Sequence, residues 1–360
     1  MIYTSFLGMT SSIILNIKTN VNSIKSMNKK VYNYFETIRF LLVSLQNIFY
    51  NKIHLWSILF LQMIYSNRAS AQDPTLPPTN LGAVNVFDGM GGKPGFVYQG
   101  FVQIFQTNKV VNGQGQDIHS DLKVNSIVQI NQIIYQTPIK VFGGILGFTV
   151  IIPVVQINAS NSGGPSPTVN PNVLGDITQG TAIQWSEKKL FGKPFSHRLD
   201  VNFTLPIGSY NEKYNINPSA QAYTFSTNHA FTLILNDRVS ISARNQFNYN
   251  TRIVGQKAKA GAFYNGNYSI DYAIFPNFRV EAASYFLAQL NEDSYDGDSD
   301  YYQQEMGIND TKERVLGYGA GLAYFTKGGA LIELKAFFET ASKNRVEGYR
   351  PTLRIAIPLN

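Results

Sequence analysis

The chain contains no cysteine, and its 360 residues include only 4 histidines and 2 tryptophans. Without Cys, and without an H-E-x-x-H pattern, zinc chemistry has little basis. No G-x-S-x-G motif occurs, so the nucleophile elbow of α/β-hydrolases is absent. The sequence also has no run of eighteen apolar residues, which argues against a helical membrane protein. A β-barrel escapes that test because only alternate residues face lipid.

Charged residues are sparse, at 15% of the chain, and they are unevenly placed. The formal charge of +7 comes mostly from residues 1–71, which hold seven Lys or Arg and only one acidic residue, Glu36. Removing that net +6 leaves the remaining chain near +1. The basic total is therefore no argument for nucleic-acid binding, and we expect none.

The first 71 residues read as a leader that carries a secretory signal. Lys52 precedes an apolar run at 55–65, and an A-x-A cleavage site ends at Ala71. We therefore predict cleavage after Ala71. A short membrane anchor is the alternative, but this apolar run is too short to span a bilayer.

The stretch 259–300 carries the strongest structural pattern. Two runs alternate apolar and polar residues, joined by Phe275-Pro276-Asn277. Because successive side chains of a strand point to opposite faces, this period predicts a β-hairpin. Each run has about ten residues or more, longer than most soluble strands and enough to cross a bilayer when tilted. The apolar positions are Ala262, Tyr264, Tyr268, Ile270, Tyr272, Ile274, Phe278, Val280, Ala282, Phe286 and Ala288.

Similar strands without an intervening helix fill residues 96–360, which predicts an all-β, antiparallel up-and-down transmembrane barrel of about twelve strands, of outer-membrane type. Long polar loops alternate with tight turns, so both termini are expected on the periplasmic, short-turn side. The predicted turns are 136–138, 236–238, 275–277 and 326–329, and 186–196 is longer than this pattern expects. The predicted strands are 96–106, 122–135, 139–157, 176–185, 197–208, 222–235, 239–250, 260–274, 278–290, 314–325, 330–339 and 349–359. The predicted long loops are 107–121, 158–175, 209–221, 251–259, 291–313 and 340–348.

Residues 72–95 are rich in Pro and Gly and lack strand periodicity. This segment is either a loose periplasmic tail or a plug tucked into the barrel mouth. The residues expected to form such a plug are Leu81, Phe87, Asp88 and Lys93.

Eight charged residues fall on polar-face positions in the half of the wall near the short turns; we call them the charge belt. Unpaired charges are costly in a narrow lumen, so these residues are expected to neutralise one another across neighbouring strands. The belt is either a salt-bridge network that fills the barrel or a constriction that screens solutes by size and polarity. Its members are Asp200, Arg244, Asp271, Arg279, Glu281, Glu333, Lys335 and Arg354.

Two further patterns are weak. The loop after residue 290 begins like a calcium loop, but its sixth position is Tyr301 and its twelfth is Gly307. A solvated acidic loop is the simpler interpretation, with divalent-ion bridging to lipopolysaccharide as the alternative. An esterase would need a Ser and a His together, for which His229 near Ser226 and His197 beside Ser196 are candidates. The acidic loop residues are Glu292, Asp293, Asp296, Asp298 and Asp300.

Several segments resemble the outer-membrane proteins of the meta-pathway phenol-degradation family, a family of proposed transporters. The resemblance implies a barrel that passes small, often aromatic or hydrophobic, molecules. The segments are LPPTNLGAVNVFDGMGGKPG after the signal, LGDI at 174–177, RLDVNFTLPIGSYN at 198–211, YFLAQLNEDSYDGDS at 285–299 and RVLGYGAGLAYF at 314–325. The chain ends on Asn360, whereas outer-membrane barrels typically end on an aromatic residue.

The expected function is therefore passive uptake of small, hydrophobic or aromatic molecules across the bacterial outer membrane, without enzymatic activity or a cofactor. The alternatives are a structural or adhesive barrel with a closed lumen and, third, an outer-membrane esterase. The expected partners are outer-membrane lipid, lipopolysaccharide, the barrel-assembly machinery and the transported solute.

Overall fold

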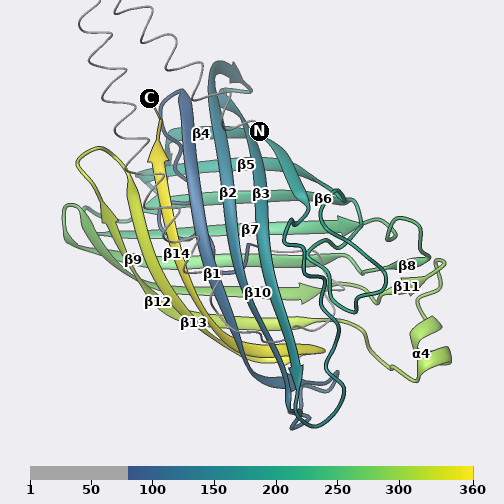
Figure 1. Cartoon of the computed structure of the whole chain (residues 1–360). Helices are drawn as coiled ribbons and strands as arrows, with labels where there is room; N and C mark the ends of the chain where they lie inside the picture. Colours follow the sequence, from purple (N-terminus) through teal and green to yellow (C-terminus); the bar gives the residue numbers. More distant parts are fainter. Residues whose placement is uncertain (1–79, 360) are drawn as a thin grey trace, which may run out of the picture. The chain divides into compact units, whose positions relative to one another are not determined.

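The computed structural model describes residues 80–359, which form a closed barrel of antiparallel strands (Figure 1). Strands adjacent in the chain are adjacent in the barrel, and β1 pairs with β14 to close it. The predicted up-and-down barrel of about twelve strands is confirmed. The predicted leader, 1–71, lies outside the described residues. No helix within residues 80–359 is long and apolar enough to span a membrane.

The barrel strands are long, as the period-two runs predicted. They are β1 Gly95–Val111, β2 Leu122–Val141, β3 Gly144–Asn161, β4 Ile177–Leu190, β5 Lys193–Leu205, β6 Thr224–Ile234, β7 Val239–Asn250, β9 Phe263–Phe275, β10 Phe278–Gln289, β12 Arg314–Phe325, β13 Leu331–Lys343 and β14 Arg345–Pro358. Two short strands, β8 Ala258–Lys259 and β11 Ser294–Tyr295, pair with each other outside the barrel.

The connections fall on two ends, which we call the turn end and the loop end. The turn end holds the start of β1, the end of β14 and all the tight hairpins except β13–β14. The loop end carries the loops 112–121, 162–176, 206–223, 251–262 and 290–313, with β8 and β11 among them (Figure 1). The predicted placement of both ends of the barrel beside the tight turns agrees with this arrangement.

The expectation of an entirely non-helical chain was wrong at one place in the loop end. The helix α4, Tyr301–Met306, occupies the loop between β10 and β12. It ends at Gly307, whose φ of 69° is left-handed and whose N–H donates to Gln303 O. Glycine adopts this conformation without a steric penalty, so it stops the helix after little more than one turn.

Two predicted turns were misplaced. The β2–β3 hairpin turns at Phe142 and Gly143, not at 136–138, and β4–β5 turns at Phe191 and Gly192 instead of using the whole of 186–196. All four residues have φ between 48° and 74°, the left-handed geometry of the tight hairpin turns that match strand twist. Pro138 lies inside β2 at a register irregularity, where a strand tolerates proline.

The predicted long loop at 340–348 was also wrong. Strand β13 ends at Lys343 and β14 begins at Arg345, so Asn344 alone connects them. The Asn344 side chain donates to the carbonyl oxygens of Asp310 and Lys312, at 2.7 and 3.2 Å. These contacts attach the hairpin to the loop 290–313, which explains why a polar sequence here is ordered as strand.

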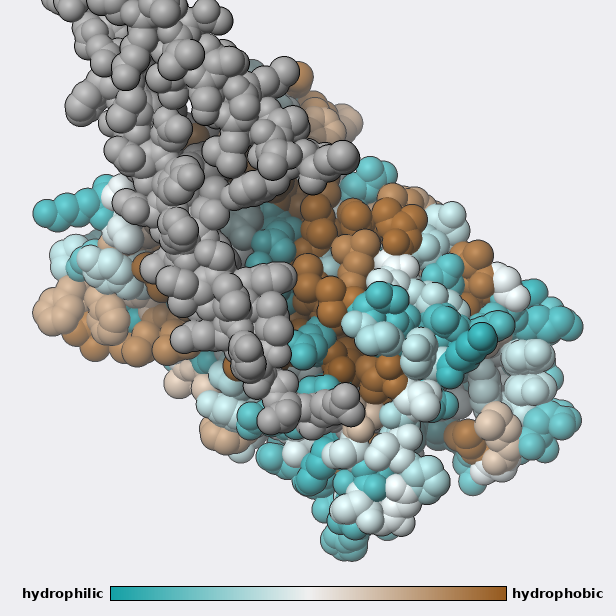
Figure 2. Space-filling view, in the orientation of Figure 1, coloured by the Kyte–Doolittle hydropathy of each residue, from teal (hydrophilic) through white to brown (hydrophobic). Residues whose placement is uncertain are grey.

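The outward face of the barrel is apolar and the inward face is polar. Leu199, Phe225, Phe247, Tyr318 and Leu334 are among the side chains that remain exposed on the strands. Figure 2 shows apolar residues on the visible wall and hydrophilic residues concentrated toward the loop end. Buried positions on the same strands are mostly Asn, Ser, Thr and charged residues. This inverted pattern is that of a barrel surrounded by lipid.

The orientation can be tested by labelling single cysteines in intact cells, because the chain has no cysteine of its own. A cysteine at Asp296 or Asn161, at the loop end, is expected to react with a membrane-impermeant maleimide from outside. A cysteine at Asn277, in the exposed β9–β10 turn, is expected to react only after the outer membrane is permeabilised. Labelling of a cysteine at Asn277 in intact cells would show that the barrel has the opposite orientation.

Candidate functional site

An N-terminal segment, residues 80–90, runs inside the barrel and contacts its wall on several sides; we call it the inner segment. Its first residue, Asn80, accepts hydrogen bonds from Asn265 and Asn267 on β9, at 2.7 and 3.1 Å. On another part of the wall, Gln103 of β1 donates to Leu81 O at 2.9 Å. Nearly all residues of the inner segment are buried. The polar inward face of the strands thus holds a stretch of chain in place of water.

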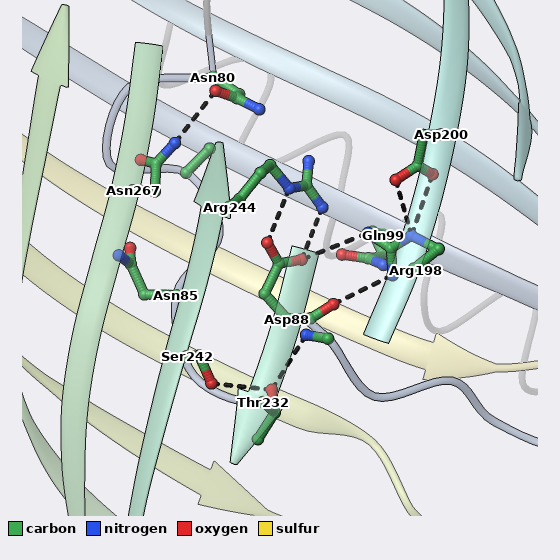
Figure 3. Close-up of polar contacts among 12 residues, drawn as sticks. Asn80, Asn85, Asp88, Gln99, Arg198, Asp200, Thr232, Ser242, Arg244 and Asn267 are labelled. Carbon is green, nitrogen blue, oxygen red and sulfur yellow. Dashed lines mark hydrogen bonds and ion pairs between the residues drawn. The ribbon is translucent and has the colours of Figure 1, made fainter. Parts of the chain in front are cut away.

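The strongest polar contacts of the inner segment centre on Asp88 (Figure 3). Arg244 of β7 donates to both Asp88 carboxylate oxygens, with Nε and Nη2 at 2.7 and 2.6 Å. Arg198 of β5 donates to the Asp88 backbone oxygen at 3.0 Å and lies 3.5 Å from its carboxylate. Arg198 also pairs with Asp200 at 3.0 Å. Strand β7 therefore holds the Asp88 carboxylate through charge-assisted hydrogen bonds, and β5 holds Asp88 through a hydrogen bond to its backbone oxygen and an ion pair.

A second group of charges holds the middle of the inner segment. Lys335 of β13 donates to Ala83 O at 3.2 Å and to Asn85 Oδ1 at 2.8 Å. The Val86 N–H donates to Glu333 at 3.3 Å. The side chains of Lys335 and Glu333 are fully buried and lie 3.3 Å apart. Their burial requires these partners, because an isolated charge here would be costly.

Gly89 shows how closely the inner segment approaches the wall. A Cβ placed on Gly89 would lie 2.1 Å from the backbone carbonyl carbon of Phe231 on β6. The Gly89 N–H donates to Thr232 Oγ1 at 3.0 Å, and Gln184 donates to Gly89 O at 2.9 Å. Any larger residue would push the segment away from β6 and break these hydrogen bonds.

Three of the four predicted plug residues, Leu81, Phe87 and Asp88, lie in the inner segment. Leu81 is buried in an apolar cluster that includes Phe263 and Phe337. The Phe87 ring packs 5.5 Å from the Phe325 ring, between centroids. Lys93 was assigned wrongly: it is exposed, just before β1, and belongs to no inward contact of the segment.

The charge belt is brought together inside the barrel, but its pairing differs from the expectation. Arg279 pairs with Asp271 on the neighbouring β9, and Arg354 pairs with Glu333 on the neighbouring β13, as expected. Asp200 instead pairs with a residue of its own strand, and Arg244 pairs with the inner segment. Glu281 forms no salt bridge with any described residue. For Arg244, the cross-strand expectation failed because the inner segment supplies the Asp88 carboxylate at 2.6 Å.

The sequence analysis missed several members of this network. Arg198 has the same strand parity as Asp200 and could have been found from it. Toward the loop end, Arg350 of β14 pairs with Glu339 at 3.2 Å, and Tyr285 donates to the same carboxylate at 2.7 Å. The Arg350 guanidinium also lies 4.8 Å from the centre of the Phe105 ring. Arg350 and Glu339 share the inward parity of the belt, but lie at the ends of the predicted strands 349–359 and 330–339, which the structure extends to Arg345 and Lys343.

A cavity of about 350 Å³ lies within the barrel beside the inner segment. We call it the lumen cavity. The side from β1, β2 and β3 is mostly apolar, and the side from β5, β6 and β7 offers amides and hydroxyls. The lining also includes the polar residues Gln103, Ser126 and Gln132 and the charged residues Asp176, Arg244, Glu313, Arg345 and Arg350. A small molecule with an apolar body and a hydrogen-bonding group would satisfy both sides. The apolar side comprises Phe101, Phe105, Val124, Val128, Ile130 and Ile151, and the polar side Asn202, Thr204, Thr224, Ser226, Asn228 and Asn248.

The acidic loop residues are largely engaged by protein groups. Asp296 accepts hydrogen bonds from Lys257 at 2.7 Å and Arg252 at 2.9 Å, and the bond from Lys257 holds the pKa of Asp296 below its usual range. Asp298 accepts from the backbone N–H of Asp300. Glu292 pairs with Lys312, and Asp293 accepts from Gly261 N–H and Gln289. Within residues 80–359, no group of three or more potential ligands could hold a metal ion.

Neither predicted Ser and His combination forms a pair. His229 and His197 lie on the outer surface and contact each other, with Nε2 and Nδ1 3.3 Å apart. Ser226 is buried and donates to Asn248 at 2.7 Å on the inner side. Ser196 precedes His197 directly on β5, so the two side chains point to opposite faces. The geometry of an esterase dyad is missing at both places.

Comparison with known proteins decides the family. The family model described as "Putative MetA-pathway of phenol degradation" matches residues 107–355. The chain belongs to this family. The resemblance noted in the sequence is thereby confirmed. No curated protein matches the chain.

Solved structures similar to this member of the phenol-degradation family support the fold. The COG4313 outer membrane channel from Pseudomonas putida F1 is 13% identical, with a TM-score of 0.63, covering 76% of this chain and 97% of that one. The TodX deltaS2S3 mutant monoaromatic hydrocarbon channel is 9% identical, covering 74% of this chain and 90% of that one. Its TM-score of 0.34 is too low to indicate a shared fold. The protein is a bacterial outer-membrane barrel.

The Asp88–Arg244 contact can be tested by a double-mutant cycle. Asp88→Ala leaves the buried Arg244 without its carboxylate and Arg198 with Asp200 alone, and is expected to lower the free energy of unfolding by about 3 kcal/mol. Arg244→Ala should lower the free energy of unfolding less in the Asp88→Ala background than in the parent, which gives a coupling energy of about 1–3 kcal/mol. Denaturant unfolding in detergent micelles measures both values.

The matched control is Asp237→Ala, in an exposed turn between β6 and β7, which should leave the midpoint unchanged. Strict additivity of Asp88→Ala and Arg244→Ala would show that the ion pair does not hold the inner segment in the micelle.

Proposed function

We propose that the protein is a passive channel for small hydrophobic or aromatic molecules, taken up from the loop end, which faces outside. The observation that carries this proposal is the lumen cavity, enclosed within an outer-membrane barrel and lined on one side by apolar groups and on the other by hydrogen-bonding groups. A fully polar lumen would suit ions and sugars better. The solute moves down its gradient, so no cofactor or bound metal takes part.

The inner segment would set the rate of passage. It lies between the lumen cavity and the turn end, where Asp88 and Gly89 are attached to β5, β6 and β7. A solute that leaves toward the periplasm must pass these residues, so the segment has to shift or leave a narrow path. Polar contacts to several strands, rather than a covalent link, make such a shift feasible.

The charge belt would serve the same step. Arg244 bonds to Asp88, and Arg279 lies 4.8 Å from the centre of the Phe87 ring, so the belt would combine a structural role with that of a constriction. Neutral solutes would pass such a region of paired charges more readily than ions, because an ion must separate pairs that stabilise the barrel.

A structural barrel with a closed lumen is the second candidate. It is favoured by the burial of the inner segment and by the number of ion pairs that fix it. An esterase function is not favoured, because the candidate Ser and His side chains are separated. Contacts with lipopolysaccharide at the acidic loop, through a divalent ion, and with the barrel-assembly machinery remain predictions.

Deletion of residues 74–93 tests the channel against the closed barrel. If the inner segment restricts the pore, the deletion should raise single-channel conductance in planar bilayers several-fold and speed the swelling of liposomes in a small neutral solute. Arg244→Ala should produce a smaller change in the same direction and alter ion selectivity, because it frees Asp88 from β7.

The control is Lys93→Ala, since Lys93 is exposed and outside the inner segment. Each variant must first migrate as a folded barrel on an unheated gel. A folded deletion variant with the conductance and solute flux of the parent would favour the closed, structural barrel.

A further inference from the structure

A second cavity, of about 340 Å³, lies among the loops of the loop end. We call it the loop pocket. Residues from three loops, 206–223, 251–262 and 290–313, line it. These loops are attached to one another: β8 pairs with β11, Gln256 donates to Tyr210 Oη at 2.7 Å, and the Gly261 N–H donates to Asp293 at 2.8 Å. The loop pocket is thus formed by cross-braced loops, and its volume is within the range of small-molecule sites.

The loop pocket has the composition of a site for a planar, partly polar molecule. Three tyrosines, Tyr210, Tyr214 and Tyr302, come from two of the loops. Tyrosine offers a flat apolar ring for stacking and a hydroxyl for hydrogen bonding. The remaining surface combines small apolar groups with amides and a hydroxyl: Ala220, Ala222, Ile253, Ala258, Ala260, Asn215, Asn217, Ser219, Asn250 and Gln256.

The charges around the loop pocket disfavour an anionic occupant. Glu212 and Asp293, two acidic residues, both line it. Lys259 is the one basic lining residue, but its Nζ lies 4.3 Å from the Tyr249 ring centre and donates to the Tyr249 hydroxyl at 3.1 Å. Tyr249 is exposed on the outer wall, so the ammonium group is directed away from the pocket. These acidic groups would repel a carboxylate, whereas they would not repel a neutral hydroxyl group.

The linings of the loop pocket and the lumen cavity meet at one hydrogen-bonded pair of side chains. Asn250 lines the loop pocket, and Thr224, its direct cross-strand partner, lines the lumen cavity. Thr224 donates to Asn250 Oδ1 at 2.9 Å, and Asn250 Nδ2 donates to Gly261 O at 3.0 Å. Rotation of the Asn250 side chain would join the two spaces. The loop pocket therefore lies directly outside the lumen cavity along the barrel wall.

We propose that the loop pocket is a separate capture site for a neutral hydroxylated aromatic molecule, and that Asn250 controls its passage to the lumen cavity. This inference rests on the proposed channel function for the direction of transfer. The ring stacks on the tyrosines, the hydroxyl bonds to the amides, and the two carboxylates exclude aromatic acids. Capture at the loops raises the solute concentration next to the lumen cavity when the external solute is scarce.

Phenol and benzoate are suitable probes, because phenol is neutral at pH 7 and benzoate is not. Equilibrium dialysis with the full chain in detergent should find two phenol sites and weak binding of benzoate. Ala258→Trp, which fills the loop pocket, should remove one phenol site. Ser226→Trp, which fills the lumen cavity, should remove the other. Ala220→Trp provides a second way to fill the loop pocket if Ala258→Trp disturbs β8.

Uptake into proteoliposomes separates capture from conduction. Filling the loop pocket should raise the half-saturating phenol concentration about tenfold, equivalent to about 1.4 kcal/mol of binding free energy, with the maximal flux little changed. Asn250→Ala should raise the maximal flux while both phenol sites remain. Ser226→Trp should abolish flux but keep the outer phenol site.

Some outcomes would overturn the inference. Two phenol sites in folded Ala258→Trp and Ala220→Trp would show that the loop pocket is not one of them, and equal affinity for benzoate would exclude the proposed solute class. An Asn250→Ala variant with unchanged flux would remove Asn250 from the passage. If the parent binds phenol at the loop pocket but conducts none, the channel proposal fails while the capture site stands.

Discussion

The structure depends on one constraint: inside a bilayer every backbone N–H and C=O must find a partner within the protein. Twelve strands meet it by closing on themselves through the β1–β14 ladder. Closure fixes which side chains face lipid and which face inward. The outward positions become apolar, and the polar groups that a soluble protein would place on its surface are enclosed instead. The inner segment and the charge belt both follow from this inversion.

A lumen lined with Arg, Asp, Glu and Lys has to neutralise its charges, and the barrel wall does so incompletely by itself. Asp271–Arg279 and Glu333–Arg354 are pairs within the wall. Arg244 and Lys335 need partners from the inner segment, which supplies Asp88, Asn85 and the Ala83 carbonyl. In the proposed channel, the segment that stabilises the wall would also obstruct the pathway. Stability and restricted passage would then come from the same contacts.

The space that is left has a consistent chemistry along the barrel axis. The lumen cavity pairs an apolar side with amides and hydroxyls, and the loop pocket repeats that combination with tyrosine rings. Ionic groups near both spaces are mostly engaged by protein partners. This distribution suits a solute that is neutral and carries both a ring and a polar group, and it is poorly suited to the transfer of ions.

The sequence alone determined the barrel, its approximate strand number and the inward side of most strands, because these depend on a two-residue period that each strand carries locally. It also placed Leu81, Phe87 and Asp88 in a possible plug. It misplaced the turns at 142–143 and 191–192. Nearby proline and charged residues suggested turns elsewhere, but the residues that adopt the left-handed φ angles of the turns are these four. Only the tertiary structure decided that Asp88 meets Arg244 and Arg198, and that three loops enclose a pocket above Thr224. Asp88 and Arg244 are 156 positions apart in the chain. No local sequence pattern specifies which of the distant residues come into contact.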